Sequence, residues 1–388
     1  MTRSAFTGPA LFSYGFRPFF LAAGVLATLV VPWWMLVWTG HAGVGGPFSP
    51  VDWHVHEMIF GYVPAVLAGF LFTAIPNWTG RLPKQGWPLA ALLALWVAGR
   101  LAVAGAGGLS PVAVAAVDAA FLVVLAAVIA AEIAAGRNWR NLKVLVPVLV
   151  LAGANVLFHV EALTQGTAAL GQRLGFAVVI FLIMLIGGRI IPSFTRNWLA
   201  KRGEGPLPAP FGRFDAASLV AAILALGIWT AAPEGPEASG ALAVAGLLHL
   251  GRLARWQGLR CARSAILLML HISYAFIPLG FAALAAGWAV AGLHLLGIGA
   301  IGGMTLSVMM RAAMGHTGRA LASGSLLASA FAAIALAAVV RSALPLETLP
   351  GASSLVLAAS LWTAAFAAFL WRVGPWLAAP SAARRQPN

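Results

Sequence analysis

Long apolar runs separated by short polar connections make up almost the whole sequence. In lipid, a run satisfies its own backbone hydrogen bonds as a helix, and the Ala-, Leu- and Val-rich composition suits helices rather than barrel strands. The predicted helices cover residues 16–38, 54–76, 87–105, 112–135, 142–164, 172–195, 214–232, 240–256, 265–287, 290–313, 320–342 and 349–372. The pattern therefore predicts an all-α polytopic membrane protein with about 12 transmembrane helices.

Composition and charge agree with this pattern. The chain is 61% hydrophobic and only 9% charged, whereas a soluble domain is about a quarter charged. The net charge of +14 comes from 24 Lys and Arg, of which 21 fall on the side of the N-terminus and three (Arg100, Arg173 and Arg341) on the other. This is the positive-inside pattern, so we expect both termini to be cytoplasmic and no nucleic-acid partner. The single cysteine, Cys261, excludes an intramolecular disulfide and covalent haem attachment, so any haem is bound non-covalently.

Short motifs recur at fixed offsets. Thr-Gly-Arg occurs at 79–81 and again 238 residues later, at 317–319. The same offset of 238 relates His56 to His294. A third match relates 75–79 to 191–195. Within a single transmembrane domain (1–388), we predict three four-helix repeats, near 16–135, 142–256 and 265–372, followed by a disordered tail at 377–388. The haem–copper oxidase catalytic subunit has the same layout, with haem ligands on helices 2 and 10, although fold alone does not imply function.

His56 and His294 are the first candidates for chemistry. Each precedes the arginine of its Thr-Gly-Arg motif by 25 residues, which is about 37 Å of helix. Both imidazoles are then expected at one depth near the outer face, as axial haem ligands. The alternative is that each imidazole only forms hydrogen bonds with its neighbours.

His54 lies two residues before His56, so on a helix the two side chains face about 200° apart. Alternatively, the helix begins at His56 and the preceding segment is extended. Glu57 either fixes an imidazole as a neighbouring partner or is a carboxylate favoured at a helix N-terminus. His159 lies near the end of its helix, and we predict that it joins His54 in a copper or non-haem iron site. The alternative for His159 is a structural role.

Several buried polar residues suggest proton paths. Asp118 is an acid inside the predicted helix 112–135, and it either pairs with a histidine or lines a proton path. With Glu57 and Glu161 it would form a short route from the outer side, which we favour. His249, His271 and Tyr274 are predicted deeper in the bilayer, where they form a second metal site or a proton relay.

The sequence resembles the NnrS family of bacterial membrane proteins. The resemblance rests on residues 16–20 (Phe-Arg-Pro-Phe-Phe), 53–58 (Trp-His-Val-His-Glu-Met), 76–81 (Pro-Asn-Trp-Thr-Gly-Arg), 302–304 (Gly-Gly-Met) and 315–319 (Gly-His-Thr-Gly-Arg). It implies an inner-membrane protein that contains haem b and copper and is tied to nitric oxide metabolism, nitrosative stress and denitrification.

Three functions follow as hypotheses. The first is a haem/copper protein that binds, reduces or detoxifies nitric oxide; the others are a multi-helix transporter and a haem-based redox relay or sensor. Transporter repeats are usually inverted or two-fold, so three parallel units favour the first. Whether the protein is an enzyme stays open. The sequence contains no flavin, nicotinamide or iron–sulfur motif, so an oxidoreductase would need a quinone or an electron-donor protein as its partner.

Overall fold

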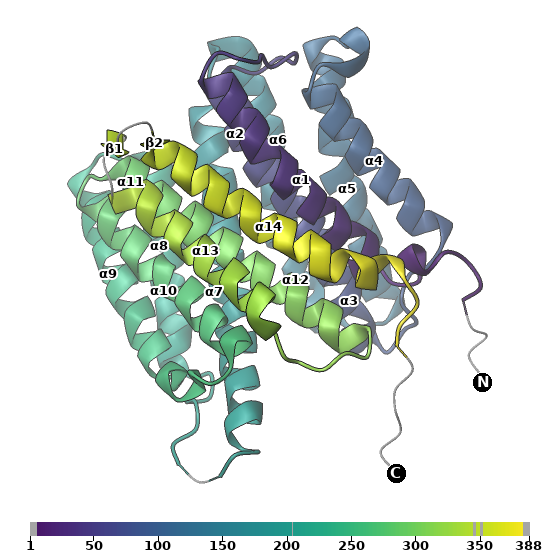
Figure 1. Cartoon of the computed structure of the whole chain (residues 1–388). Coiled ribbons are helices and arrows are strands. Elements are labelled where there is room, and N and C mark those ends of the chain that lie inside the picture. The colour runs from purple at the N-terminus through teal and green to yellow at the C-terminus, as the bar shows by residue number, and fades with distance from the viewer. Residues whose placement is uncertain (1–5, 204, 344–346, 350–351, 383–388) are drawn as a thin grey trace. The chain divides into compact units, whose positions relative to one another are not determined.

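The computed structural model describes residues 6–203, 205–343, 347–349 and 352–382, and it is almost entirely helical (Figure 1). Two short strands, β1 (Glu347–Leu349) and β2 (Ala352–Ser353), pair antiparallel. Twelve long helical segments are found in the described residues. They are α1 (Phe16–Trp38), the continuous α2 (Pro50–His56), η2 (Glu57–Tyr62) and α3 (Val63–Thr79), α4 (Trp87–Val103), α5 (Pro111–Ala135), α6 (Leu145–Gln165), α7 (Ala169–Leu199), α8 (Arg213–Ala231), α9 (Pro236–Ala254), α10 (Ala265–Ala285), the continuous α11 (Ala289–His294), η6 (Leu295–Gly302) and α12 (Gly303–His316), α13 (Gly324–Ala343) and α14 (Ser354–Ala378).

These helices confirm the all-α prediction. Of the described segments, ten have the length and apolarity needed to cross a membrane, whereas α4 is shorter and α9 is not among the ten. Several predicted boundaries differ by four residues or more. The second helix begins at Pro50 rather than at residue 54, the eighth at Pro236 rather than 240, and the eleventh at Gly324 rather than 320. The last begins at Ser354 rather than at 349, because strand residues precede it.

The chain divides into two compact units. The first unit comprises residues 1–175, 312–320 and 369–388, and the second comprises 176–311 and 321–368. Within the first unit α1 packs on α3, α4 on α5, and α5 on α6. Within the second unit α8 packs on α9, α9 on α10, and η6 on both α10 and α13. The three four-helix repeats and the disordered tail stay predictions; helix α14 extends to Ala378, and residues 383–388 lie outside the described part.

Close helix packing in the first unit depends on small residues. A side chain on Gly69 of α3 would place its Cβ 2.5 Å from the ring of Phe20 on α1, so glycine lets these helices approach. Helix α3 ends at Thr79 and is capped by Gly80, which has a positive φ of 68° and donates a backbone hydrogen bond to the Pro76 carbonyl.

Arg17, from the Phe-Arg-Pro motif of α1, stabilises the end of another helix. Its Nη1 donates hydrogen bonds to the carbonyl oxygens of Trp376, Leu377 and Ala379, at 3.0, 3.0 and 2.6 Å. Its Nη2 donates to Ser381 Oγ at 2.8 Å. A cation at a helix C-terminus satisfies carbonyls that lack helical partners and favours the negative end of the helix dipole.

Candidate functional site

The local structure around residue 50 determines where the two neighbouring histidines face. Ser49 Oγ accepts a hydrogen bond from the Asp52 N–H, and Pro50 occupies the first turn, so α2 begins before both histidines. Both are therefore helical and face different directions. The His54 ring stacks on Trp34, with 4.7 Å between ring centroids. His56 turns instead toward α5 and α6.

His56 lies in a buried polar cluster of the first unit. Its Nε2 is 3.0 Å from Asn155 Oδ1 and 3.1 Å from Asp118 Oδ2. His159 Nε2 lies 3.0 Å from the same Oδ2, to which Asn155 Nδ2 donates at 2.8 Å. Three nitrogen atoms thus converge on one carboxylate oxygen. We call the six residues His56, Glu57, Arg100, Asp118, Asn155 and His159 the His56 cluster.

Arg100 balances half of the carboxylate charge in the cluster. Its guanidinium forms ion pairs with Glu57 and Asp118, and the Glu57 Oε1 also lies 3.4 Å from His56 Nδ1. The Arg100 side chain is 10% exposed, and both carboxylates are more buried still. With neutral imidazoles, one cation and two carboxylates leave the cluster with one net negative charge.

Aromatic rings separate this charge from its surroundings. The ring centroids of Phe48, Phe60 and Phe158 lie 4.7, 5.3 and 5.2 Å from that of His56, which is fully buried. A charged cluster in an apolar environment is costly unless every member is paired, so such clusters are commonly functional.

Three members of the cluster offer metal-ligand atoms. One atom each from His56, Asp118 and His159 lies within 4.8 Å of the other two, and all three residues are buried. Two imidazoles and one carboxylate are ligands for copper or non-haem iron. In the structure His159 thus lies with His56, whereas His54, its predicted partner, stacks on Trp34.

Glu161, a predicted proton carrier, lies outside this cluster. Its two carboxylate oxygens accept hydrogen bonds from the backbone N–H groups of Leu170 and Gly171, at 3.1 and 2.7 Å. These donors belong to the first turn of α7, where N–H groups lack helical partners. Glu161 therefore stabilises the start of α7.

His294 belongs to the second unit and is partly exposed. Its Nδ1 donates a hydrogen bond to the Val290 carbonyl at 2.7 Å. That bond fixes the tautomer and leaves the lone pair on Nε2, as in many metal-binding histidines. Arg341 lies on α13, which packs against α11, and its buried Nε has no hydrogen-bond partner among the described residues.

Two further predicted residues, His249 and Tyr274, belong to a second buried network. His249 Nε2 donates to the Ser218 carbonyl at 3.2 Å, and its Nδ1 accepts from the Tyr274 hydroxyl at 2.7 Å. That hydroxyl accepts from Arg252 Nη1 at 2.8 Å, and Arg252 pairs with Asp215 at 3.1 Å. Both ring nitrogens of His249 are therefore occupied by protein groups.

His271 lies apart from this network. Its Nδ1 donates to the Leu267 carbonyl at 2.9 Å, and its Nε2 is 3.5 Å from Thr195 Oγ1. Although His271 is one helical turn from Tyr274, the hydroxyl of Tyr274 bonds to His249 instead.

Sequence reasoning missed Arg100, Arg252 and Asp215. Charge counting alone places Arg100 on the side of the membrane opposite the N-terminus. The signal that could have placed it was the presence of Glu57 and Asp118 in apolar helices, because buried carboxylates require a cation. The same reasoning would have paired Asp215 with an arginine of the following helix.

Comparisons with known proteins agree with the resemblance in the sequence. A search of curated proteins finds no match to this chain. The model of the NnrS protein family matches residues 10–381, which is nearly the whole chain. The protein therefore belongs to the NnrS family.

Proposed function

We propose that this protein is a haem- and copper-containing protein of the bacterial inner membrane that binds or converts nitric oxide. The observation that carries the proposal is the convergence of His56, Asp118 and His159 inside a buried cluster. Membership of the NnrS family supports the link to nitric oxide. The excess of Lys and Arg on one side supports cytoplasmic termini.

The donor set of the His56 cluster suits a compact metal ion. Imidazole nitrogens with one carboxylate oxygen bind divalent first-row metals, and copper has the highest affinity in that series. With neutral imidazoles the cluster has one net negative charge, so a cation is favoured there. Arg100 and Glu57 would hold Asp118 and His56 in position, as outer partners do in metal sites.

Haem suits the surroundings of His294 better than those of His56. His294 presents Nε2 while Nδ1 bonds to a carbonyl, and the buried Nε of Arg341 is available to an anionic group such as a haem propionate. His56 faces acceptor oxygens at both nitrogens and has aromatic rings around it. The role of His56 as a haem ligand stays a prediction. When bound, haem would supply iron, to which nitric oxide binds.

Metal and haem analysis of purified variants tests the proposal. We expect haem absorption and about one copper per chain in the natural protein, loss of copper in His159→Ala and Asp118→Asn, and loss of the Soret band in His294→Ala. His54→Ala is the matched control, because that imidazole lies outside the cluster. Copper loss in His54→Ala alone would favour the sequence-based pairing of His54 with His159.

The proposal fails if the purified natural protein contains neither haem nor a transition metal. Circular dichroism and gel filtration of each variant separate loss of a cofactor from loss of the fold. Nitric oxide consumption by proteoliposomes with an added electron donor then distinguishes conversion from binding.

A further inference from the structure

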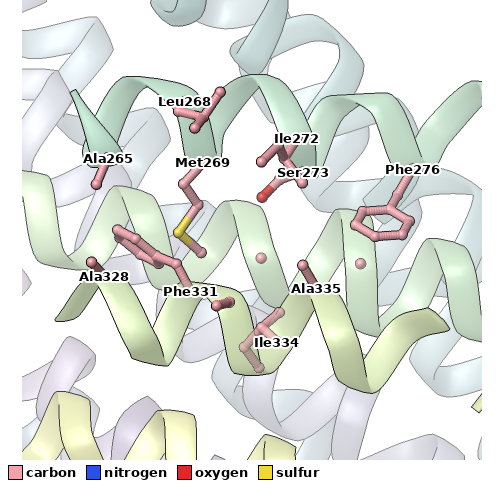
Figure 2. Close-up of a pocket in the computed structure, with 13 residues that line it drawn as sticks. Ala265, Leu268, Met269, Ile272, Ser273, Phe276, Ala328, Phe331, Ile334 and Ala335 are labelled. Carbon is pink, nitrogen blue, oxygen red and sulfur yellow. The ribbon is translucent and has the colours of Figure 1, made fainter. Parts of the chain in front are cut away.

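A pocket of about 170 Å³ opens in the second unit between α10, α13 and the η6–α12 segment (Figure 2). Leu268, Met269 and Phe276 of α10 line one wall, and Phe331 and Ala335 of α13 line another. The third wall contains Gly299 and Gly303, whose missing side chains leave the space open. The lining is almost wholly apolar and includes no residue of the His56 cluster.

Ser273 supplies the polar side chain of this pocket. The residue is 2% exposed, and Figure 2 shows its hydroxyl directed into the pocket. Serine and threonine within apolar helices commonly bond to the carbonyl four residues earlier, as Thr305 and Ser307 do here at 2.6 Å. Among the described residues, Ser273 has no hydrogen-bond partner. The hydroxyl opens into the pocket rather than being enclosed by protein, so a ligand bound there can supply its hydrogen-bond partner.

The size of the pocket limits that ligand. An apolar cavity of about 150 Å³ accommodates benzene, so one six-membered ring fits here. A porphyrin with its four pyrrole rings does not, and a two-atom gas would leave most of the volume empty. The rim contains Ile272, which is 39% exposed, and the exposed Ala332. A chain attached to the ring can therefore leave the pocket toward the lipid that surrounds apolar helices.

We infer that this pocket binds the ring of a membrane quinone. A quinone ring is flat, bears carbonyl acceptors for the Ser273 hydroxyl, and carries an apolar tail that remains in the bilayer. The rings of Phe276 and Phe331 and the thioether of Met269 are suitable contacts for its faces and edges. A lipid acyl chain fills the same space less well, because it leaves the Ser273 hydroxyl without a partner.

The inference concerns binding only and does not depend on the metal site. The pocket belongs to the second unit, and the candidate copper ligands His56, Asp118 and His159 belong to the first. Loss of quinone binding and loss of metal can thus be measured separately in the same purified protein.

Titration of the full-length protein with a short-chain ubiquinone analogue carrying a photoreactive azide tests the inference. We expect saturable binding, with photolabel on peptides of α10 and α13. Ser273→Ala should weaken binding about 2- to 10-fold, the usual effect of losing one neutral hydrogen bond. Ala335→Leu should abolish binding by filling the pocket, and Ala328→Leu provides a second filling variant if the first does not fold.

Ser329→Ala is the matched control, because this exposed serine of α13 bonds to the Leu326 carbonyl of its own helix. Its affinity should equal that of the natural protein. Unchanged affinity in both Ser273→Ala and a folded filling variant would overturn the inference. Displacement of the probe by a fatty acid, with no effect of Ser273→Ala on either ligand, would assign the pocket to lipid chains and also overturn it. Metal content should be unchanged in all these variants.

Discussion

Removing the positive charge of Arg100 is the sharpest test of the His56 cluster. In Arg100→Met the apolar stem is retained, but Glu57 and Asp118 lose their shared guanidinium. Asp118 keeps hydrogen bonds from Asn155 and His159. Glu57 keeps only the long 3.4 Å contact with His56, so its carboxylate is the group left without adequate compensation.

The expected loss follows from the burial of the pair. Breaking a buried ion pair by removing one partner costs about 3–5 kcal/mol, because the remaining charge is desolvated without compensation. Since Arg100 is 10% exposed, we expect the lower end, about 3 kcal/mol. Glu57→Gln in the Arg100→Met background removes the stranded charge and should recover part of that loss. Asp118→Asn in the same background should recover less, because Asp118 retains other donors.

Equilibrium unfolding in mixed micelles with increasing sodium dodecyl sulfate, followed by circular dichroism, measures these differences. Arg202→Met is the control, because Arg202 is exposed and lies over the Trp198 ring at 3.8 Å. Its loss should cost less than about 1 kcal/mol. A loss below about 1 kcal/mol in Arg100→Met, or equal recovery by Glu57→Gln and Asp118→Asn, would refute the assigned charge distribution.

Three further predictions use the same unfolding assay or chemical labelling. Arg17→Ala should lower the free energy of unfolding by about 2 kcal/mol or more, because four hydrogen bonds at the end of α14 are lost. An unfolding free energy equal to that of the natural protein would contradict this. Glu161→Gln should cost about 1 kcal/mol through weaker capping of α7, and no change would indicate that its charge is irrelevant there. Burial raises the pKa of the Cys261 thiol, so at neutral pH it stays protonated and maleimide labelling should be slower than for free cysteine and accelerate as pH rises. Rapid labelling that does not depend on pH would contradict this burial.

Hydrophobic patterning predicted the helices well, because length and apolarity alone decide whether a segment is helical in lipid. The predicted helix 16–38 matches α1, and most other boundaries differ by a few residues. The exceptions involve polar local signals. Ser49 and Pro50 begin α2 before its apolar run, and the paired strands β1 and β2 precede α14, which is shorter at its start than predicted.

The grouping of site residues was harder to predict, because it depends on which faces of distant helices meet. Spacing on one helix correctly separated His54 from His56, since both lie on α2 and contact different neighbours. No local pattern indicates that Asp118 of α5 contacts residues of both α2 and α6. The expected depth of each histidine in the membrane also did not identify its partners, because many side chains lie at the same depth without contacting one another.

Backbone irregularities support an equivalence between the first and third predicted repeats. The offset of 238 that relates His56 to His294 also relates the π-helical segments η2 and η6, which each begin at the following residue. It relates Gly80 to Gly318, with φ of 68° and 75°. π-Helical turns are rare and occur mostly at functional sites. Shared irregularities at one offset are therefore stronger support than a shared three-residue motif.

The same offset also shows how the two histidines differ. At that offset Asp118 corresponds to Val356 and Glu57 to Leu295, so neither acid of the His56 cluster has an acidic counterpart. Without those acids, the surroundings of His294 do not favour a compact cation in the way that the His56 cluster does. Instead, His294 bonds to its own helix through Nδ1, and Arg341 is available for an anion. We therefore expect a related backbone to serve two cofactors, with the metal ion bound at the acidic site and the anionic haem at the basic one.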